Sequence, residues 1–204
     1  LDVYPYVAGS SVLNRKSAAN ATRTVITWSK ADPSATGRDL QDLAREAGCT
    51  VEECIERLQP AGAIYYCMEE ADVRRILRYS GTMIGSDGLP HDEMPHPRLW
   101  GTFPRILGRY CRSLGILSLE EAVHRMTALA ADEFGLVDRG RVRVGCFADL
   151  VVFDPATVED RATYAEPTRP AAGIDIVLVN GVPAWERGRP TGERQGRVLR
   201  RHAN

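Results

Sequence analysis

The order of strand and helix patterns along the first two thirds of the chain constrains its fold most. Apolar and amphipathic periodicity predicts strands at residues 63–67 and 82–85, and helices at 70–79, 103–113 and 119–134. Strands that alternate with helices are typical of layered α/β folds. We therefore expect residues 1–135 to form an α/β unit, most economically the last units of a TIM-like (β/α)8 barrel.

The pattern changes after Gly135, where β-rich stretches follow one another without a long helical pattern between them. These stretches cover residues 142–144, 148–153 and 174–179. Asn180-Gly181 then lies between two apolar stretches and is a strong hairpin signal. We expect residues 136–204 to form a second, all-β unit that ends in a solvated, Arg-rich tail.

The first 60 residues are predicted to contain two strands and a pair of short helices. Strand-like composition occupies residues 1–7 and 22–30, the small residues 8–11 favour a loop, and helical spacing covers 40–47 and 50–58. Thr50 and Glu53 have the spacing of a capping box, and Ser118 and Glu121 repeat it before the last predicted helix.

Charge and cysteine content exclude some classes of partner. The chain has 26 basic and 27 acidic residues in 204, so its net charge of -1 creates no large field for nucleic acid or an anionic membrane. No stretch approaches the roughly 18 apolar residues of a membrane span. Five scattered cysteines without a CxxC pair predict a reduced, cytoplasmic protein. The expected partner is a small molecule, and a chain that opens on Leu1 is expected to be a piece of a longer protein.

Asp87 is the first candidate for chemistry. It follows the strand predicted at 82–85 directly, and Gly85 and Gly88 flank it. Catalytic groups of a barrel lie at the C-terminal ends of its strands, and glycines let the backbone turn sharply there. An Asp between glycines is also a common turn residue, so the position alone leaves both interpretations open.

The loop after this aspartate concentrates polar side chains between prolines, as loops that serve a site often do. His91 and His96 are candidate metal ligands, but their spacing matches no common zinc motif, which favours supporting or structural roles. Arg98 has two alternatives. Its planar fork could hold a carboxylate, or it could pair with Asp92 or Glu93.

Two tyrosines, Tyr4 and Tyr6, lie in the strand predicted at the start of the chain. Because side chains alternate along a strand and Pro5 fixes the backbone between them, only one can face the mouth of a barrel. One of the pair is therefore a candidate for binding a substrate.

Three stretches together resemble one family. Residues 4–10 (YPYVAGS), residues 83–104 (MIGSDGLPH running on to PHPRLWGTFP) and residues 145–155 (GCFADLVVFDP) are similar to the D-aminoacylase group of the amidohydrolase superfamily. The resemblance implies a metal-dependent hydrolase barrel followed by part of a small β-sandwich domain. It also implies zinc-dependent hydrolysis of the linear amide bond of an N-acyl-D-amino acid, which gives a D-amino acid and a carboxylate.

The resemblance assigns roles to four residues. Asp87 resembles the general base and acid of the family, and it would be a minor zinc ligand at most. Arg98 and Tyr4 resemble the groups that hold the α-carboxylate of the substrate, and Ser10 resembles a further polar contact. The family binds zinc through a His-x-His pair, a Cys and two further His, whereas no His precedes His91 here. The resemblance therefore implies that the N-terminal half of the barrel, in cis or in trans, carries the principal ligands.

The residues leave two alternatives open. The chain could belong to another amidohydrolase of hydantoinase or dihydroorotase type, although the Tyr4 and Arg98 motifs disfavour this. It could also be a non-catalytic, truncated homologue that acts as a structural subunit. The residues do not decide whether the substrate side chain is neutral or acidic.

Overall fold

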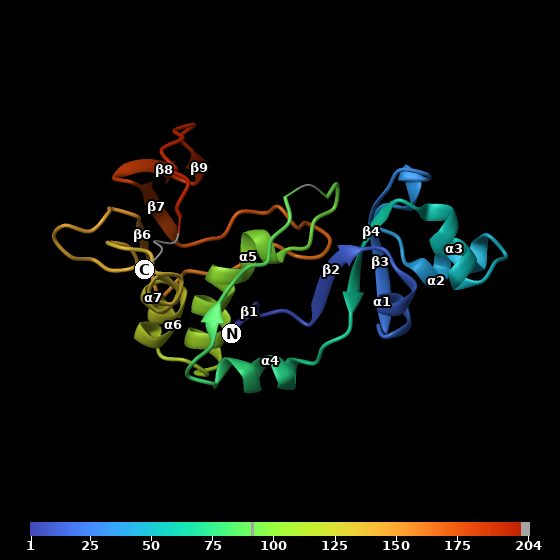
Figure 1. The fold of residues 1–204 in the computed structure, drawn as a ribbon, viewed down its shortest axis with the longest axis horizontal. Coiled ribbons are helices and arrows are strands. Elements are labelled where there is room, and N and C mark those ends of the chain that lie inside the picture. The colour runs from blue at the N-terminus through green and yellow to red at the C-terminus, as the bar shows by residue number, and fades with distance from the viewer. Residues whose placement is uncertain (91, 201–204) are drawn as a thin grey trace.

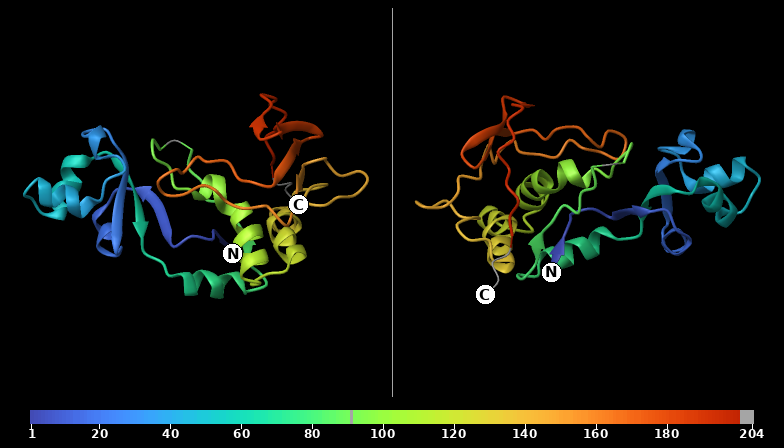
Figure 2. Two further views of the ribbon diagram at one scale, coloured as in Figure 1. Left: turned by 180° about the vertical axis from the view of Figure 1, so that it is seen from behind. Right: turned by 45° about the horizontal axis from the view of Figure 1, so that its top comes forward.

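The described part of the chain folds around three separate sheets, which lie in a row along the long axis of the molecule (Figure 1). The computed structural model describes residues 1–90 and 92–200. A three-stranded antiparallel sheet occupies one end, a four-stranded antiparallel sheet occupies the other, and a parallel pair of strands lies between them. Two further views show the same order of the three parts (Figure 2).

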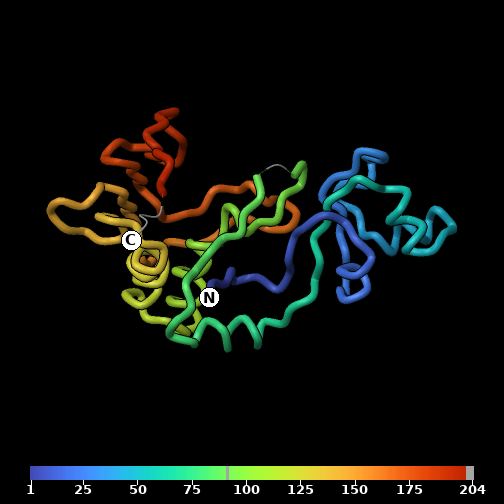
Figure 3. The backbone as a smooth tube through the Cα atoms, viewed as in Figure 1, coloured from blue at the N-terminus to red at the C-terminus, as the bar shows by residue number. Residues whose placement is uncertain are grey.

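The central pair consists of β1 (Asp2–Val3) and β5 (Met83–Ile84), which run parallel with Val3 opposite Ile84. Between them the chain travels to the far end of the molecule and returns along α4 (Glu70–Leu77), a path that Figure 3 follows. A helix that returns the chain to a parallel neighbour is the connection expected in a layered α/β fold. The strand predicted at 82–85 and the helix predicted at 70–79 are confirmed.

The strand predicted at 63–67 is also present, but its expected place as a barrel strand is wrong. It forms β4 (Ala61–Tyr66), the middle strand of the antiparallel sheet, between β2 (Ala8–Val12) and β3 (Arg23–Ser29). The loop expected at 8–11 is likewise wrong, because these small residues pair with β4 and place Ser10 opposite Ile64. Pairing with a buried neighbour outweighs weak strand propensity, and a single-sequence pattern does not reveal that neighbour.

Within the described residues, this sheet packs with α1 (Arg15–Ala19), α2 (Leu40–Glu46), α3 (Val51–Leu58) and the short 3-10 helix η1 (Pro33–Ala35). The predicted capping box is confirmed, since Thr50 and Glu53 exchange both side-chain-to-backbone hydrogen bonds. Buried side chains from the sheet and the helices form one apolar cluster. This segment between β1 and β5, which we call the insert (residues 8–66), therefore has a hydrophobic core of its own.

A second apolar cluster lies under β5 and joins α4 to the helices that follow. These are α5 (Arg98–Arg105), a π-helix over Ile106–Ser113, α6 (Leu119–Met126) and α7 (Ala128–Phe134). The helix predicted at 119–134 is thus divided at Thr127, whose φ of -130° and ψ of -87° are not helical. The Thr127 hydroxyl donates to the Val123 carbonyl, an interaction that often bends helices. The predicted end at Gly135 is confirmed by its φ of 65°.

The four-stranded sheet is built from β6 (Leu150–Phe153), β7 (Ile174–Val179), β8 (Val182–Glu186) and β9 (Arg189–Pro190). The predicted hairpin is confirmed, because Asn180 and Gly181 both have positive φ between β7 and β8. Residues 142–144 form no strand, and Val142 and Val144 are exposed. No helix among the described residues is long and apolar enough to cross a lipid bilayer.

Candidate active site

Asp87 lies three residues beyond the end of β5, in a turn with an unusual backbone. Its φ of 47° is rare for a residue other than glycine. A Cβ at Gly85 would lie 2.6 Å from the Asp2 carboxylate oxygen, and one at Gly88 would meet Leu99 at 2.3 Å. The flanking glycines therefore allow a close approach of neighbouring side chains as well as a sharp turn.

The Asp87 carboxylate reaches an open cavity of about 700 Å³. Asp2, Val3 and Tyr4 line this cavity from the β1 side, and residues of α4 line it from the other. The side chain of Asp87 is 61% exposed in this chain. An accessible carboxylate at the end of a strand, above a cavity, can exchange protons with a bound molecule.

Arg98, the first residue of α5, connects to this carboxylate. Its Nη2 lies 2.9 Å from Asp87 Oδ2, although the Arg98 side chain is only 2% exposed. Within the described residues its carboxylate partner is therefore Asp87, and the alternative of a pair with Asp92 or Glu93 is wrong. A buried guanidinium needs several partners, because an unpaired buried charge is costly.

Tyr4 and Ser10 supply further partners for Arg98. The guanidinium carbon lies 4.6 Å from the centre of the Tyr4 ring, within range of a cation–π interaction, and Nη2 donates to the Ser10 carbonyl at 3.4 Å. Burial raises the pKa of Tyr4, so its hydroxyl keeps its proton and can donate. The structure thus brings together Asp87, Arg98, Tyr4 and Ser10.

Two polar atoms of this group are buried and have no hydrogen-bond partner among the described residues: Arg98 Nε and Ser10 Oγ. Such atoms are expensive to leave unsatisfied. Because both belong to residues that also contact each other, the pair can accept a ligand with oxygen acceptors, such as a carboxylate. A guanidinium fork binds a carboxylate through two nitrogens, and Arg98 Nε is available for one of them.

His96 is not placed as a metal ligand. It is 4% exposed, and both of its ring nitrogens contact the backbone: Nδ1 accepts from the Arg98 N–H at 3.0 Å, and Nε2 lies 3.0 Å from the Ala8 carbonyl oxygen. Its metal-ligand interpretation is therefore wrong for this structure, and its structural interpretation fits. His91, the other histidine of the loop, lies outside the described residues.

Zinc would need ligands that the described part of the chain does not gather. Within residues 1–90 and 92–200, no three His, Cys, Asp or Glu side chains come together in a way that could hold a metal ion. Three carboxylates line the cavity among the described residues: Asp87 and Asp2 beside the β1–β5 pair, and Asp72 on α4. The residues present thus fit at most part of a metal site, and they do not hold zinc by themselves.

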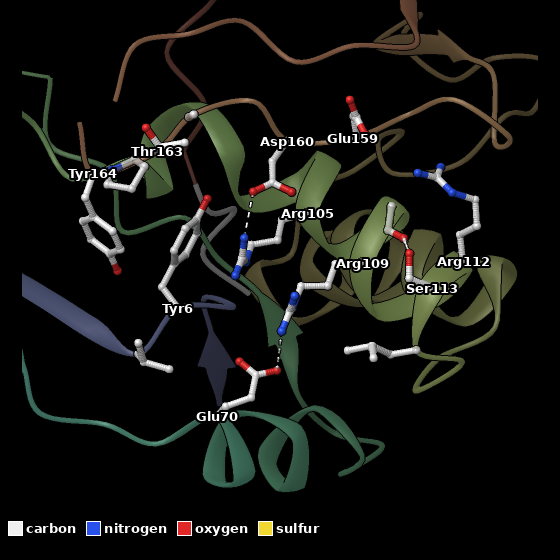
Figure 4. Close-up of a pocket in the computed structure, with 15 residues that line it drawn as sticks. Tyr6, Glu70, Arg105, Arg109, Arg112, Ser113, Glu159, Asp160, Thr163 and Tyr164 are labelled. Atoms are coloured by element: carbon white, nitrogen blue, oxygen red, sulfur yellow. Dashed lines mark hydrogen bonds and ion pairs between the residues drawn. The ribbon is translucent and has the colours of Figure 1, made fainter. Parts of the chain in front are cut away.

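The strand predicted at residues 1–7 forms only at Asp2–Val3, so strand alternation does not decide the directions of Tyr4 and Tyr6. Tyr4 lines the Asp87 cavity, whereas Tyr6 does not. Tyr6 lines a second cavity of about 580 Å³ between α5, the π-helix and the segment 159–164, where two ion pairs lie close together (Figure 4). Arg105 donates to Asp160 at 2.9 Å and to the Pro5 carbonyl, while Arg109 lies 3.5 Å from Glu70. These arginines join separate segments of the chain, so we assign this cavity a structural role.

Sequence reasoning missed Tyr164, which lies far along the chain from the other site residues. Its ring packs edge-on against His96, with ring centroids 5.1 Å apart, and its hydroxyl lies 3.4 Å from His96 Nε2. Tyr4 and Tyr6 also contact the His96 ring. The segment around Tyr164 has no periodic pattern, and no signal in the sequence places it beside residue 96.

Comparison with known proteins identifies the class to which this fold and site belong. The chain belongs to the amidohydrolase family, whose model matches residues 20–184. Three similar proteins come from Alcaligenes xylosoxydans xylosoxydans. A D-aminoacylase is 58% identical over 203 residues, an N-acyl-D-glutamate deacylase 50% over 204, and an N-acyl-D-aspartate deacylase 51% over 199. These matches cover 98–100% of the chain but only 40–42% of the relatives.

Solved structures agree with these relatives. A crystal structure of D-aminoacylase, 58% identical, matches with a TM-score of 0.95 over 98% of this chain and 42% of its own length. The N-acyl-D-glutamate deacylase of Bordetella bronchiseptica, in complex with zinc and a phosphonate inhibitor, is 49% identical. It matches with a TM-score of 0.88 over 93% of this chain and 41% of its own. The predicted resemblance and the amidohydrolase fold are confirmed.

Proposed function

We propose that the protein containing this chain is a zinc-dependent N-acyl-D-amino-acid deacylase, a hydrolase of linear amide bonds. The contact between Arg98 and Asp87 carries this proposal. In an N-acyl amino acid the α-carboxylate and the scissile amide nitrogen are attached to the same carbon, so a clamp for one and an acid for the other must be neighbours. The 2.9 Å separation meets this requirement.

The same proposal assigns the parts of the fold. Residues 1–135 would be the C-terminal part of the catalytic barrel, with β1 and β5 as its last two strands and the insert between them. Residues 136–204 would be a segment of a β-sandwich domain. The parallel register of β1 and β5 and the change to antiparallel β6–β9 support this division. The N-terminal half of the barrel would come from the rest of the protein, since the chain spans about two fifths of its relatives.

Substrate binding falls to three residues. Arg98 would hold the α-carboxylate through its fork, with Nε as the unused donor. Tyr4 would donate its hydroxyl to the same group and would also keep the guanidinium in place by its ring. Ser10 Oγ would make a further polar contact from β2. Together these groups would orient the substrate so that the amide lies over the cavity beside Asp87.

Asp87 would move the proton. As a carboxylate it can take a proton from the attacking water, and as the resulting acid it can deliver that proton to the departing amine nitrogen. Its 61% exposure in this chain leaves space for both partners. Zinc would polarise the acyl carbonyl and lower the pKa of the water. Asp87 would contribute one carboxylate to the metal site, and the principal ligands would come from outside this chain.

Names of the relatives support the substrate class without choosing a side chain. The relatives with 50–58% identity are named D-aminoacylase, N-acyl-D-glutamate deacylase and N-acyl-D-aspartate deacylase. A cyclic-amide hydrolase or a non-catalytic subunit is not favoured by this set. The cytoplasmic location stays a prediction.

The test uses the full-length protein that contains this chain, purified with zinc. It should release free D-amino acid from N-acetyl-D-methionine, N-acetyl-D-glutamate or N-acetyl-D-aspartate, measured by chiral chromatography, and the L-enantiomers serve as controls. Failure to release amino acid from any of the three by folded, zinc-loaded protein would contradict the proposal.

A further inference from the structure

His96 lies between the start of α5, which carries Arg98, and β2, which carries Ser10. Its ring lies 5.1–6.2 Å from the rings of Tyr4, Tyr6 and Tyr164, all in tilted or edge-on contacts. Three such contacts around one buried ring leave it little freedom to rotate. The orientation of both ring nitrogens is therefore set by packing.

The backbone decides which nitrogen carries the proton. Nδ1 faces the Arg98 N–H, which can only donate, and Nε2 faces the Ala8 carbonyl, which can only accept. His96 is therefore the neutral tautomer with its proton on Nε2. A second proton on Nδ1 would set two donors against each other beside the Arg98 cation. Burial, with the Arg98 charge, lowers the pKa of His96 to about 3.

The hydrogen bonds of His96 to the Arg98 N–H and to the Ala8 carbonyl help to fix the position of Arg98. This residue begins α5, whose N-cap Pro97 offers no side-chain cap, so the Arg98 N–H depends on His96 for its partner. On the other side, Ala8 begins β2 and lies two residues before Ser10. His96 thus links the backbone of Arg98 to β2, the strand that carries Ser10.

We infer that His96 is a positioning residue of the deacylase reaction, which holds Arg98 at the correct distance from Ser10 and Tyr4. This inference rests on the proposed function, since it needs Arg98 to bind the substrate carboxylate. His96 touches no reacting atom in this arrangement. It acts through the placement of Arg98 in substrate binding, and a small displacement of such a group can lower kcat/KM by up to about 100-fold.

The experiment separates the two bonds in the full-length, zinc-loaded protein. His96→Asn keeps an oxygen that can accept from the Arg98 N–H but loses the link to Ala8. His96→Gln keeps a donor for the Ala8 carbonyl but loses the link to Arg98. We expect each variant to raise KM for the best N-acetyl-D-amino acid roughly 10-fold or more, with kcat within about threefold. His124→Asn, at an exposed histidine of α6, is the matched control and should leave KM unchanged.

A double-mutant cycle with Arg98→Lys shows whether the effect passes through Arg98. In that background the His96 variants should change kcat/KM less than about twofold, because the fork that they position is already gone. Equal losses in both backgrounds, or a loss in kcat at unchanged KM, would overturn the role of His96 while the deacylase function stands. A wild-type protein without deacylase activity would overturn both.

Discussion

Arg98 Nη2 lies 2.9 Å from Asp87 Oδ2, and the two side chains differ widely in exposure, at 2% and 61%. The cation is held inside the protein, whereas the carboxylate extends toward the cavity. In this arrangement the carboxylate of a substrate would compete with Asp87 for the guanidinium. Binding at Arg98 would then free Asp87 for proton transfer.

Replacement of the carboxylate tests the proton-transfer role. We expect Asp87→Asn to lower kcat of the full-length protein about 10²- to 10⁴-fold, because an amide cannot take or return the proton. Zinc content, measured by mass spectrometry, should stay unchanged. Asp72→Asn, at a carboxylate that lines the same cavity from α4, is the control. A near-normal kcat in Asp87→Asn would remove Asp87 from the mechanism.

Replacement of the guanidinium tests the clamp. Arg98→Lys keeps the charge but loses the fork, so we expect KM for N-acetyl-D-amino acids to rise roughly 10- to 100-fold, as for the loss of a charged hydrogen bond. Initial-rate kinetics measure this change. Arg75→Lys provides the control, since Arg75 lies on α4 at the same cavity and is exposed. An unchanged KM in Arg98→Lys would argue against carboxylate binding there.

The two tyrosines beside Pro5 should respond differently to loss of the hydroxyl. Tyr4→Phe keeps the ring against Arg98 but removes a donor, and we expect KM to rise about 5- to 10-fold. Tyr6→Phe should leave KM unchanged, because Tyr6 Oη has no partner among the described residues and faces the other cavity. Equal effects of the two changes on KM would refute the assignment of Tyr4.

Acid should destabilise the protein through His96. The pKa of His96 is about 3 in the folded protein and near 6.5 when unfolded, so only the unfolded chain binds the proton between these values. Stability is therefore fully present above pH 6.5 and falls as pH drops, by about 1.4 kcal/mol per pH unit from this group. Urea unfolding at pH 8 to 4 measures the slope. His96→Gln should flatten it, and the exposed His124→Gln should not.

Local signals in the sequence predicted local structure well. The Thr50 capping box, the Asn180-Gly181 hairpin and the stop at Gly135 are all formed, because each depends on a few neighbouring residues. Pairing partners were harder to predict. The structure has β4 in an antiparallel sheet and residues 8–11 in a strand. Both features depend on contacts between segments about 50 residues apart.

In the candidate site, too, features set by neighbouring residues were predicted, and contacts between distant residues were not. Asp87 and Arg98 were accessible to sequence reasoning because glycines, prolines and a strand end surround them. Their mutual pairing was not, since Asp92 and Glu93 were nearer in sequence and equally suitable in charge. The position of Tyr164 and the backbone bonds of His96 depend on how distant segments pack, and a single sequence carries no signal for that packing.

The insert between β1 and β5 can change in sequence independently of the helices that pack under β5. Its apolar cluster shares no side chain with the cluster under β5, so its surface and interior can diverge while the helices behind Asp87 stay as they are. Ala8 and Ser10 lie in β2, the first strand of the insert, so changes there would reach a substrate bound at the proposed site. In the proposed site, substrate preference would therefore be able to change on the side of the insert while the residues around Asp87 stay the same.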